Sequence, residues 1–266
     1  MTDALPKFDS PPLIETILGV EFEPLWAFEI PYFGLFWSRI RENYPNSLVQ
    51  PPLDSSIETF GASQRIINLK WERTPDVRCW FSDLTTTWLI QIQKTRFINN
   101  WRATGTNKTS YPHYENVRQR FLDEWLNFNN FLEEEKIGQP PVLQCEITYV
   151  NHIETEPQLA NLHEIFPSLE PVKKVSDFLS QPEAIVTNFV YVIPENRGRL
   201  YLEMQPVFRH ADLREVLQLR LTAKVLPKSS NNDDMIEAFD LGREWAVRGF
   251  TDFTSEKMHK HWQRKQ

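Results

Sequence analysis

Cysteine is scarce in this sequence. Among 266 residues only Cys79 and Cys145 are present, each in an apolar, strand-like stretch and not in a C-x-x-C pair. Such thiols are expected to be reduced and buried, which indicates a reducing compartment. No apolar run approaches the roughly 18 residues that span a bilayer, and the first residues lack the basic and apolar segments of a signal peptide. These observations predict a cytoplasmic protein.

Positive charge and glycine are also in short supply. Lys and Arg number 29 against 36 Asp and Glu, so the formal net charge is −7. No global basic field attracts a phosphate backbone, and nucleic acid is therefore a poor candidate for a direct partner. The eight glycines are isolated and form no P-loop, G-x-G-x-x-G motif or G-x-S-x-G elbow. The sequence thus gives no support to phosphate-cradling chemistry.

Histidine patterning gives no metal site. None of the six histidines has a second one four residues away, the spacing that places two ligands on one helical face. His259 and His261 are two residues apart on an expected helix and point roughly 200° apart around it. We expect neither a metal ion nor a cofactor, and we assign no catalytic residue.

Aromatic residues are abundant, and they fall into helical stripes. The stretch 114–136 places Val117, Phe121, Trp125, Phe128 and Leu132 at steps of three or four. A second stripe follows in the last helix, from about 233 to 247, and it consists of Met235, Phe239, Gly242 and Ala246. Each stripe is expected to pack on a sheet.

Strand patterns recur in a similar order in both halves. The first half predicts strands at 13–25, 56–62, 64–72, 76–83 and 85–100, with a short helix at 31–44. The second half restarts at 142–154 and continues with strands near 185–193, 199–208 and 216–226. We therefore predict an α+β fold of two β-α-β(n)-α units, 1–138 and 139–266. Each unit is an antiparallel sheet covered by a long helix, and the two form a pseudo-symmetric duplication packed as one body.

The end of the 85–100 strand carries the first candidate site. Side chains alternate along a strand, so Asn99 and Trp101 are expected on one face and Asn100 and Arg102 on the other. In a structural interpretation, Trp101 is buried and Asn caps the end of the sheet. In a functional interpretation, Arg102 offers five donors to an anion and Trp101 offers a stacking surface. Both interpretations stay open.

Several motifs together resemble a known family. QIQKTRFINNWR at 91–102, YPHYENVRQRF at 111–121 and CEITYVNHI at 145–153 resemble the signatures F-x-x-N-W, Y-P-x-Y and E-x-T-Y-x-N of a sporadically distributed, functionally uncharacterised prokaryotic protein family. The resemblance extends over nearly the whole sequence and implies no established cofactor or catalytic residue. It marks as signature positions Asn100, Trp101, Tyr111, Pro112, Tyr149 and Asn151.

Two functional hypotheses follow. The first is a non-enzymatic cytoplasmic interaction or accessory protein, of the kind found in toxin–antitoxin or phage-defence systems, that binds the product of a neighbouring gene through an acidic and aromatic surface. The second is a small-ligand-binding domain or enzyme with a pocket between the sheet and a long helix, using Arg102 with Glu146 or Glu203. The candidate binding residues are Asn100, Trp101, Arg102, Tyr111, Tyr149 and Asn151.

Overall fold

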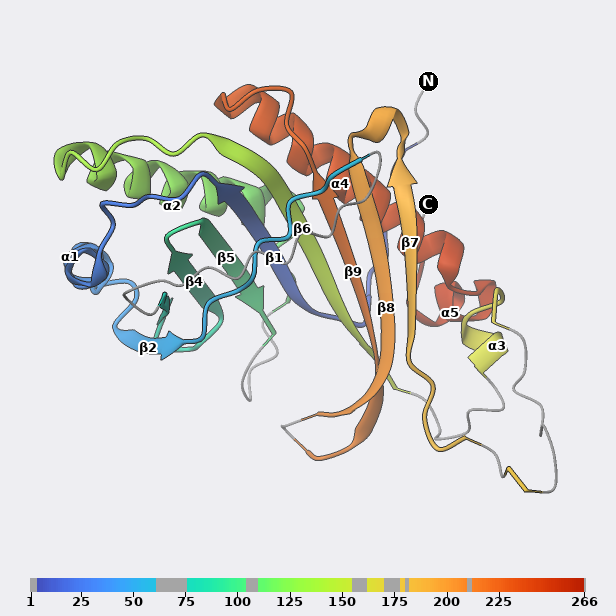
Figure 1. Ribbon diagram of the computed structural model, residues 1–266. Helices are drawn as coiled ribbons and strands as arrows, with labels where there is room; N and C mark the ends of the chain where they lie inside the picture. The colour runs from blue at the N-terminus through green and yellow to red at the C-terminus, as the bar shows by residue number, and fades with distance from the viewer. Residues whose placement is uncertain are drawn as a thin grey trace.

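The strands of this protein join in one sheet. The computed structural model describes residues 4–60, 76–103, 110–154, 162–169, 178–179, 182–209 and 212–265. Within them, nine strands form a single antiparallel sheet in the order β2-β3-β4-β5-β1-β6-β9-β8-β7 (Figure 1). The strands are β1 (Leu13–Phe22), β2 (Asn46–Gln50), β3 (Arg78–Ser82), β4 (Trp88–Gln93), β5 (Arg96–Arg102), β6 (Val142–Ile153), β7 (Thr187–Ile193), β8 (Gly198–Phe208) and β9 (Glu215–Val225).

Two long helices cover one face of this sheet. Helix α2 (Tyr114–Glu134) packs on β1 and β5, and α4 (Asn232–Phe253) packs on β6, β8 and β9. Figure 1 shows both helices on the same side of the sheet. The shorter helices are α1 (Ile30–Ile40), α3 (Leu162–Ile165), the 3-10 turn η2 (Pro194–Asn196) and α5 (Glu256–His261). No helix in the described ranges is both long enough and apolar enough to cross a membrane.

The predicted fold class, two separately covered sheets, is wrong. The first strands of the two halves, β1 and β6, pair with each other, with Leu18 opposite Ile147. The other edge of β1 pairs with β5, and the other edge of β6 pairs with β9. A buried strand must satisfy its backbone groups on both edges, and pairing the two first strands does this at the centre of the sheet. The halves therefore share one nine-stranded sheet. The division at residue 138 stays a prediction.

The core between helices and sheet is aromatic, as the stripes predict. All five stripe residues of α2 are buried, and Phe128 stacks on Phe97 of β5 with ring centroids 5.3 Å apart. Phe121 meets Phe239 of α4 at 4.9 Å, which joins the two helices over the central strands. A Cβ at Gly242 would lie 2.8 Å from the side chain of Ile147, so glycine lets α4 approach β6 closely. Both cysteines are free and buried.

One predicted strand is absent and another lies outside the described residues. Residues 56–60 of the predicted strand 56–62 belong to no strand of the sheet. They lie within a segment, residues 51–60, that we call the strap. Figure 1 shows the strap crossing the strands on the face opposite α2 and α4. The predicted strand 64–72 falls outside the described ranges.

Candidate functional site

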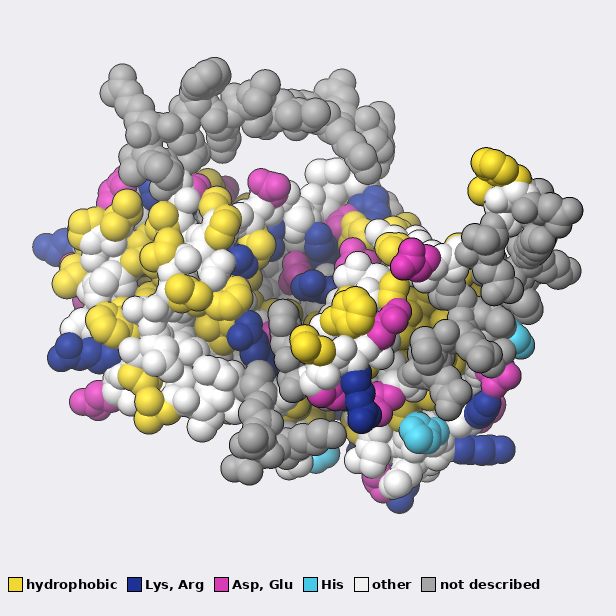
Figure 2. All heavy atoms as spheres, turned by 90° about the horizontal axis from the view of Figure 1, so that it is seen from below, with side chains coloured by type: hydrophobic (Ala, Val, Ile, Leu, Met, Phe, Trp, Pro, Cys, Tyr) yellow, Lys and Arg dark blue, Asp and Glu magenta, His cyan; other side chains and the backbone are white. Residues whose placement is uncertain are grey.

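The face of the sheet opposite the long helices carries rows of polar side chains, and we call it the polar face. Residues paired across neighbouring strands point to the same face, so the strand register defines these rows. Row one contains Gln93, Arg96, Glu21 and Gln144; row two contains Gln91, Ile98, Gly19, Glu146, Lys224 and Arg199; row three contains Leu89, Asn100, Ile17, Thr148, Thr222 and Tyr201; row four contains Arg102, Glu15, Val150, Arg220 and Glu203. Figure 2 shows a hollow in the middle of the molecule's underside, with side chains of both charges inside it.

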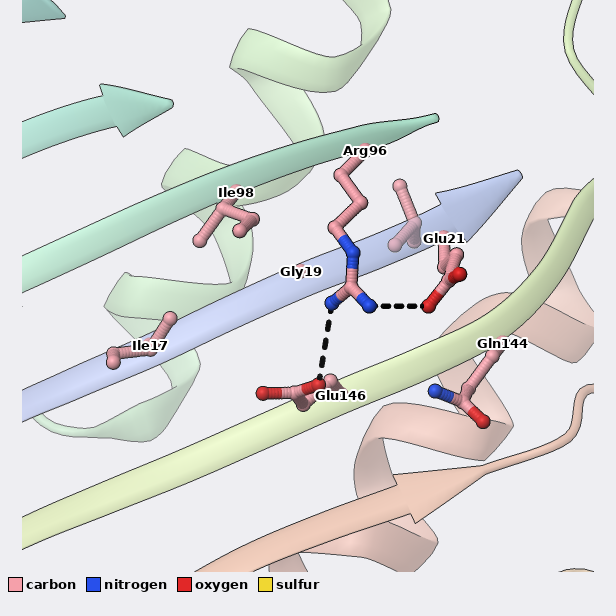
Figure 3. Close-up of a pocket in the computed structure, with 8 residues that line it drawn as sticks. Ile17, Gly19, Glu21, Arg96, Ile98, Gln144 and Glu146 are labelled. Carbon is pink, nitrogen blue, oxygen red and sulfur yellow. Dashed lines mark ion pairs between the residues drawn. The ribbon is translucent and has the colours of Figure 1, made fainter. Parts of the chain in front are cut away.

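A buried ion pair stands at the centre of row one. Arg96 Nη2 lies 2.6 Å from Glu21 Oε2, and their side chains are only 8% and 3% exposed. A second carboxylate, Glu146, lies 3.7 Å from Arg96 Nη1 (Figure 3). Gly19, Ile17 and Ile98 line a shallow, almost filled hollow beside these groups (Figure 3). The guanidinium thus balances two carboxylates in a place where unpaired charge is costly.

The strap is bound by side chains of the polar face. Gln93 holds Leu53 at both backbone groups: it accepts from the N–H at 2.9 Å and donates to the C=O at 3.0 Å. Arg96 donates to the C=O of Asp54 and to the hydroxyl of Ser56, both at 2.8 Å. Most of these contacts are hydrogen bonds to backbone atoms of the strap, as a neighbouring strand would make, although the strap runs across the strands.

The middle of the strap is held in the same way. Glu21 accepts from the Ser55 hydroxyl at 2.5 Å and from the Ser56 N–H at 3.3 Å. Gln144 accepts from the N–H of Glu58 at 2.8 Å and donates to the C=O of Ser56 at 3.3 Å. Arg78 of β3 also donates to the C=O of Pro51 at 3.1 Å, so five neighbouring strands, β3, β4, β5, β1 and β6, each bind the strap through one residue.

The far end of the strap carries a buried carboxylate. The hydroxyl of Tyr201 donates to Glu58 Oε1 at 2.5 Å, and Arg199 pairs with Oε2 of the same carboxylate. A second nitrogen of Arg199 donates to the C=O of Thr59 at 3.1 Å. Burial, together with the hydrogen bond to Glu58, raises the pKa of Tyr201 to about 12, so its hydroxyl stays a donor at neutral pH. This end of the polar face is an anion-binding pocket for a strap carboxylate.

Two candidates from the sequence, Asn100 and Arg102, lie in a second cluster on the polar face. Asn100 donates to Glu15 Oε1 at 2.8 Å, and Arg102 Nε donates to the same oxygen at 2.7 Å. Gln91 donates to the Asn100 side-chain oxygen at 2.8 Å. The guanidinium of Arg102 also lies 5.1 Å from the ring centroid of Trp80. This Arg–Trp cluster (Trp80, Gln91, Asn100, Arg102 and Glu15) combines a cation, a carboxylate and a flat aromatic surface.

The other candidates lie on the opposite side of the sheet. Trp101 is 2% exposed and its ring centroid is 5.2 Å from that of Tyr111, beneath α2. Thr16 of β1 lies opposite Trp101 of β5 on one edge and opposite Tyr149 of β6 on the other. Burial raises the pKa of both Tyr111 and Tyr149. Asn151 is buried on the Tyr149 side of β6 and donates to the C=O of Leu219 at 3.3 Å. The six candidates therefore divide between the polar face and the core.

Sequence reasoning missed most residues that bind the strap. Glu21, Arg96, Gln144 and Arg199 were not singled out, although the polar residues on alternate positions of 91–93 and 144–148 signal a polar sheet face. Nothing near Glu58 in the sequence indicates its buried position, because the partners of its carboxylate lie more than 140 residues away. Of the two strand carboxylates considered for catalysis, Glu146 lines the hollow of row one and Glu203 is exposed in row four.

A second hollow lies between α2 and α4. It measures about 840 Å³ including open solvent and is lined by residues of both helices and of the segment near Leu5. Arg118 binds both oxygens of Asp240, at 2.6 and 2.7 Å, and Arg243 donates to Glu115 at 2.9 Å. These ion pairs link the two helices across the hollow, so its charged side chains stabilise the fold.

The described residues hold no group of three or more His, Cys, Asp and Glu side chains that could bind a metal ion.

Comparison with known proteins adds no assignment to this geometry. No protein-family model and no curated protein matches the sequence. The family resemblance of the motifs at 91–102, 111–121 and 145–153 therefore stays a prediction. The contacts described above are the evidence for the site.

Proposed function

We propose that this molecule is a cytoplasmic protein-interaction protein, an accessory component rather than an enzyme, and that its polar face receives an extended segment of a partner protein. The observation that carries the proposal is the strap. Side chains from five adjacent strands bind the backbone N–H and C=O groups of an extended segment. These groups are common to all polypeptides, so a surface that forms hydrogen bonds to them suits a protein ligand.

The polar face extends beyond the strap. Row four lies six residues along the strands from row one, a distance of roughly 20 Å at 3.3 Å per residue. Arg102 and Glu15 of the Arg–Trp cluster lie there, with Arg220 and Glu203 further across the sheet. A mixture of both charges with one aromatic ring offers complementary contacts to a polypeptide, whereas a nucleic-acid backbone requires an excess of cations.

The proposed partner is the product of a neighbouring gene, as in toxin–antitoxin or phage-defence systems. The support for this step is the resemblance of the sequence motifs to a sporadically distributed prokaryotic family, together with an overall charge of −7. A surface without an excess of positive charge favours a protein over a nucleic acid as the direct partner.

Co-expression with the products of the flanking genes tests the proposal. We expect one of them to form a stoichiometric complex, seen by size-exclusion chromatography with light scattering, and we expect Arg102→Ala to weaken it. Arg39→Ala is the matched control, because Arg39 bonds to Asn127 and Glu134 of α2 on the other side of the molecule. The melting temperature of each variant shows that the fold is kept.

A different ligand class would overturn the proposal. A nucleotide or metabolite that binds only the folded protein raises its melting temperature by mass action. If such a compound raised the melting temperature by several degrees, if Arg102→Ala removed the shift, and if no flanking gene product bound, the small-ligand hypothesis would replace this one.

A further inference from the structure

The strap is held by polar contacts along its length and by one aromatic contact at its end, where the Arg199 guanidinium lies 4.2 Å from the centroid of the half-buried Phe60 ring. Its two aliphatic side chains, Leu53 and Ile57, remain 37% and 36% exposed. No apolar side chain of the strap belongs to the buried core or packs against it, so burial of apolar area contributes less to keeping the strap in place than it does for the strands. A hydrogen bond exchanged for one with water contributes only about 0.5–1.5 kcal/mol net. A second polypeptide that offers the same polar pattern can replace the strap at small cost.

The contacts define what such a polypeptide must offer. Gln93 and Gln144 each bind a backbone N–H and a backbone C=O, so the polypeptide has to be extended and unpaired where it crosses β4 and β6. Glu21 receives a hydroxyl, and the pair Arg199 and Tyr201 receives a carboxylate. The pattern corresponds to an extended acidic segment with a hydroxyl residue three positions before its carboxylate, as Ser55 stands before Glu58.

We propose that the strap is an internal ligand that an extended acidic peptide of a partner protein displaces, with a partner carboxylate taking the place of Glu58 between Arg199 and Tyr201. This inference rests on the proposed function and specifies the ligand of its site. Displacement is opposed by the high effective concentration of a segment joined covalently to its own binding surface, which is of millimolar order for short connections. The strap therefore sets an affinity threshold that excludes weakly matching peptides.

A peptide with the strap sequence PPLDSSIETF, labelled with a fluorophore, tests the inference by fluorescence anisotropy. The full-length protein with Ser55→Ala and Glu58→Ala has a weakened strap and an unaltered binding surface. We expect it to bind the peptide at least about tenfold more tightly than the unsubstituted protein does, because the competing strap has lost charge-assisted hydrogen bonds. The same peptide carrying Glu58→Gln is the ligand control and should bind at least about tenfold more weakly.

Adding Arg199→Ala to the weakened-strap protein should reverse the gain, while adding Arg39→Ala should not. If the peptide binds neither protein, or if it binds the weakened-strap protein equally well with and without Arg199, the inference is wrong.

Hydrogen exchange supplies a measurement on the unsubstituted protein. The amides of Leu53, Ser56 and Glu58 bond to side chains and not to a strand ladder. We expect them to exchange at least about 100-fold faster than the amide of Leu18 in the central strand β1, since local opening of the strap needs no global unfolding. Equal rates would show that the strap opens only when the protein unfolds.

The two proposals fail in different ways. If a flanking gene product binds and Arg102→Ala weakens the complex, but the strap amides keep their protection in the complex, the function stands and the displacement is refuted. If the peptide binds the weakened-strap protein with the expected dependence on Arg199 and no protein partner is found, the surface is correctly described and the partner is not.

Discussion

Replacing Arg96 by leucine is expected to lower the free energy of unfolding by about 3–5 kcal/mol, the cost of breaking a buried ion pair from one side. The guanidinium lies 2.6 Å from Glu21 and 3.7 Å from Glu146, and it donates to Asp54 and Ser56 of the strap. Its removal leaves two carboxylates near Gly19 without their cation, and one of them is almost fully buried.

Replacing Glu21 should lower the free energy of unfolding by less than replacing Arg96 does. In a Glu21→Leu variant, Arg96 keeps Glu146 as a counter-ion and keeps its bonds to the strap. We expect a loss of about 1–3 kcal/mol, which corresponds to the strap donors that lose their acceptor. The double variant should be more stable than the sum of the single losses implies, because only the more exposed Glu146, and not the buried Glu21, is then left without its cation.

Urea denaturation at pH 7, followed by tryptophan fluorescence, measures these differences. The control is Arg39→Leu, whose partner Glu134 is exposed and whose loss should change stability by no more than about 1 kcal/mol. If Arg96→Leu cost no more than this control, or less than Glu21→Leu, the account of a buried guanidinium balancing two carboxylates would be refuted.

Three further predictions concern other buried residues. Trp101→Ala should cost about 3–5 kcal/mol in chemical denaturation, whereas Trp26→Ala, at a position 65% exposed, should cost about 0.5 kcal/mol or less; a similar loss for both would contradict a structural role for Trp101. Asn99 is fully buried, and neither atom of its amide is hydrogen-bonded in the described structure, so Asn99→Leu should raise stability by about 1–3 kcal/mol; a lower melting temperature would show that the amide has a partner. Burial lowers the pKa of His152, so the unfolded state takes up its proton first and stability falls as the pH drops below about 6.5. His152→Gln should flatten the stability profile between pH 7 and 5, and the exposed His261→Gln should leave it unchanged.

Part of the candidate site follows from local pattern. Strand alternation places Trp101 and Asn100 on opposite faces, and the structure has Trp101 in the core and Asn100 on the polar face. All five residues that helical spacing predicts for the stripe of α2 are buried, and Tyr114 and Phe131 are buried beside them. These predictions succeed because a periodicity of two or 3.6 residues is set by backbone geometry over a few residues.

The strap was not predictable in this way. Its residues 56–60 belong to the stretch SIETFGA, which polar residues separate from the neighbouring stretches, and this pattern predicts a strand at 56–62. The segment lies across the strands, however, and its backbone groups bond to side chains such as those of Gln93 and Gln144 in place of a ladder. A local pattern does not distinguish a segment that lies beside a strand from one that crosses it.

The sequence by itself determined a buried stripe along each long helix, the faces of the strand that ends in Asn100 and Trp101, and that both cysteines are core thiols. Tertiary structure alone decided that the two halves form one sheet through β1 and β6, and that Glu58 meets Arg199 and Tyr201. The physical reason is the range of the interactions. Periodic burial is fixed by neighbours within a few residues, whereas the strap bonds to the sheet join residues 27 to 143 positions apart, and only folding brings these together.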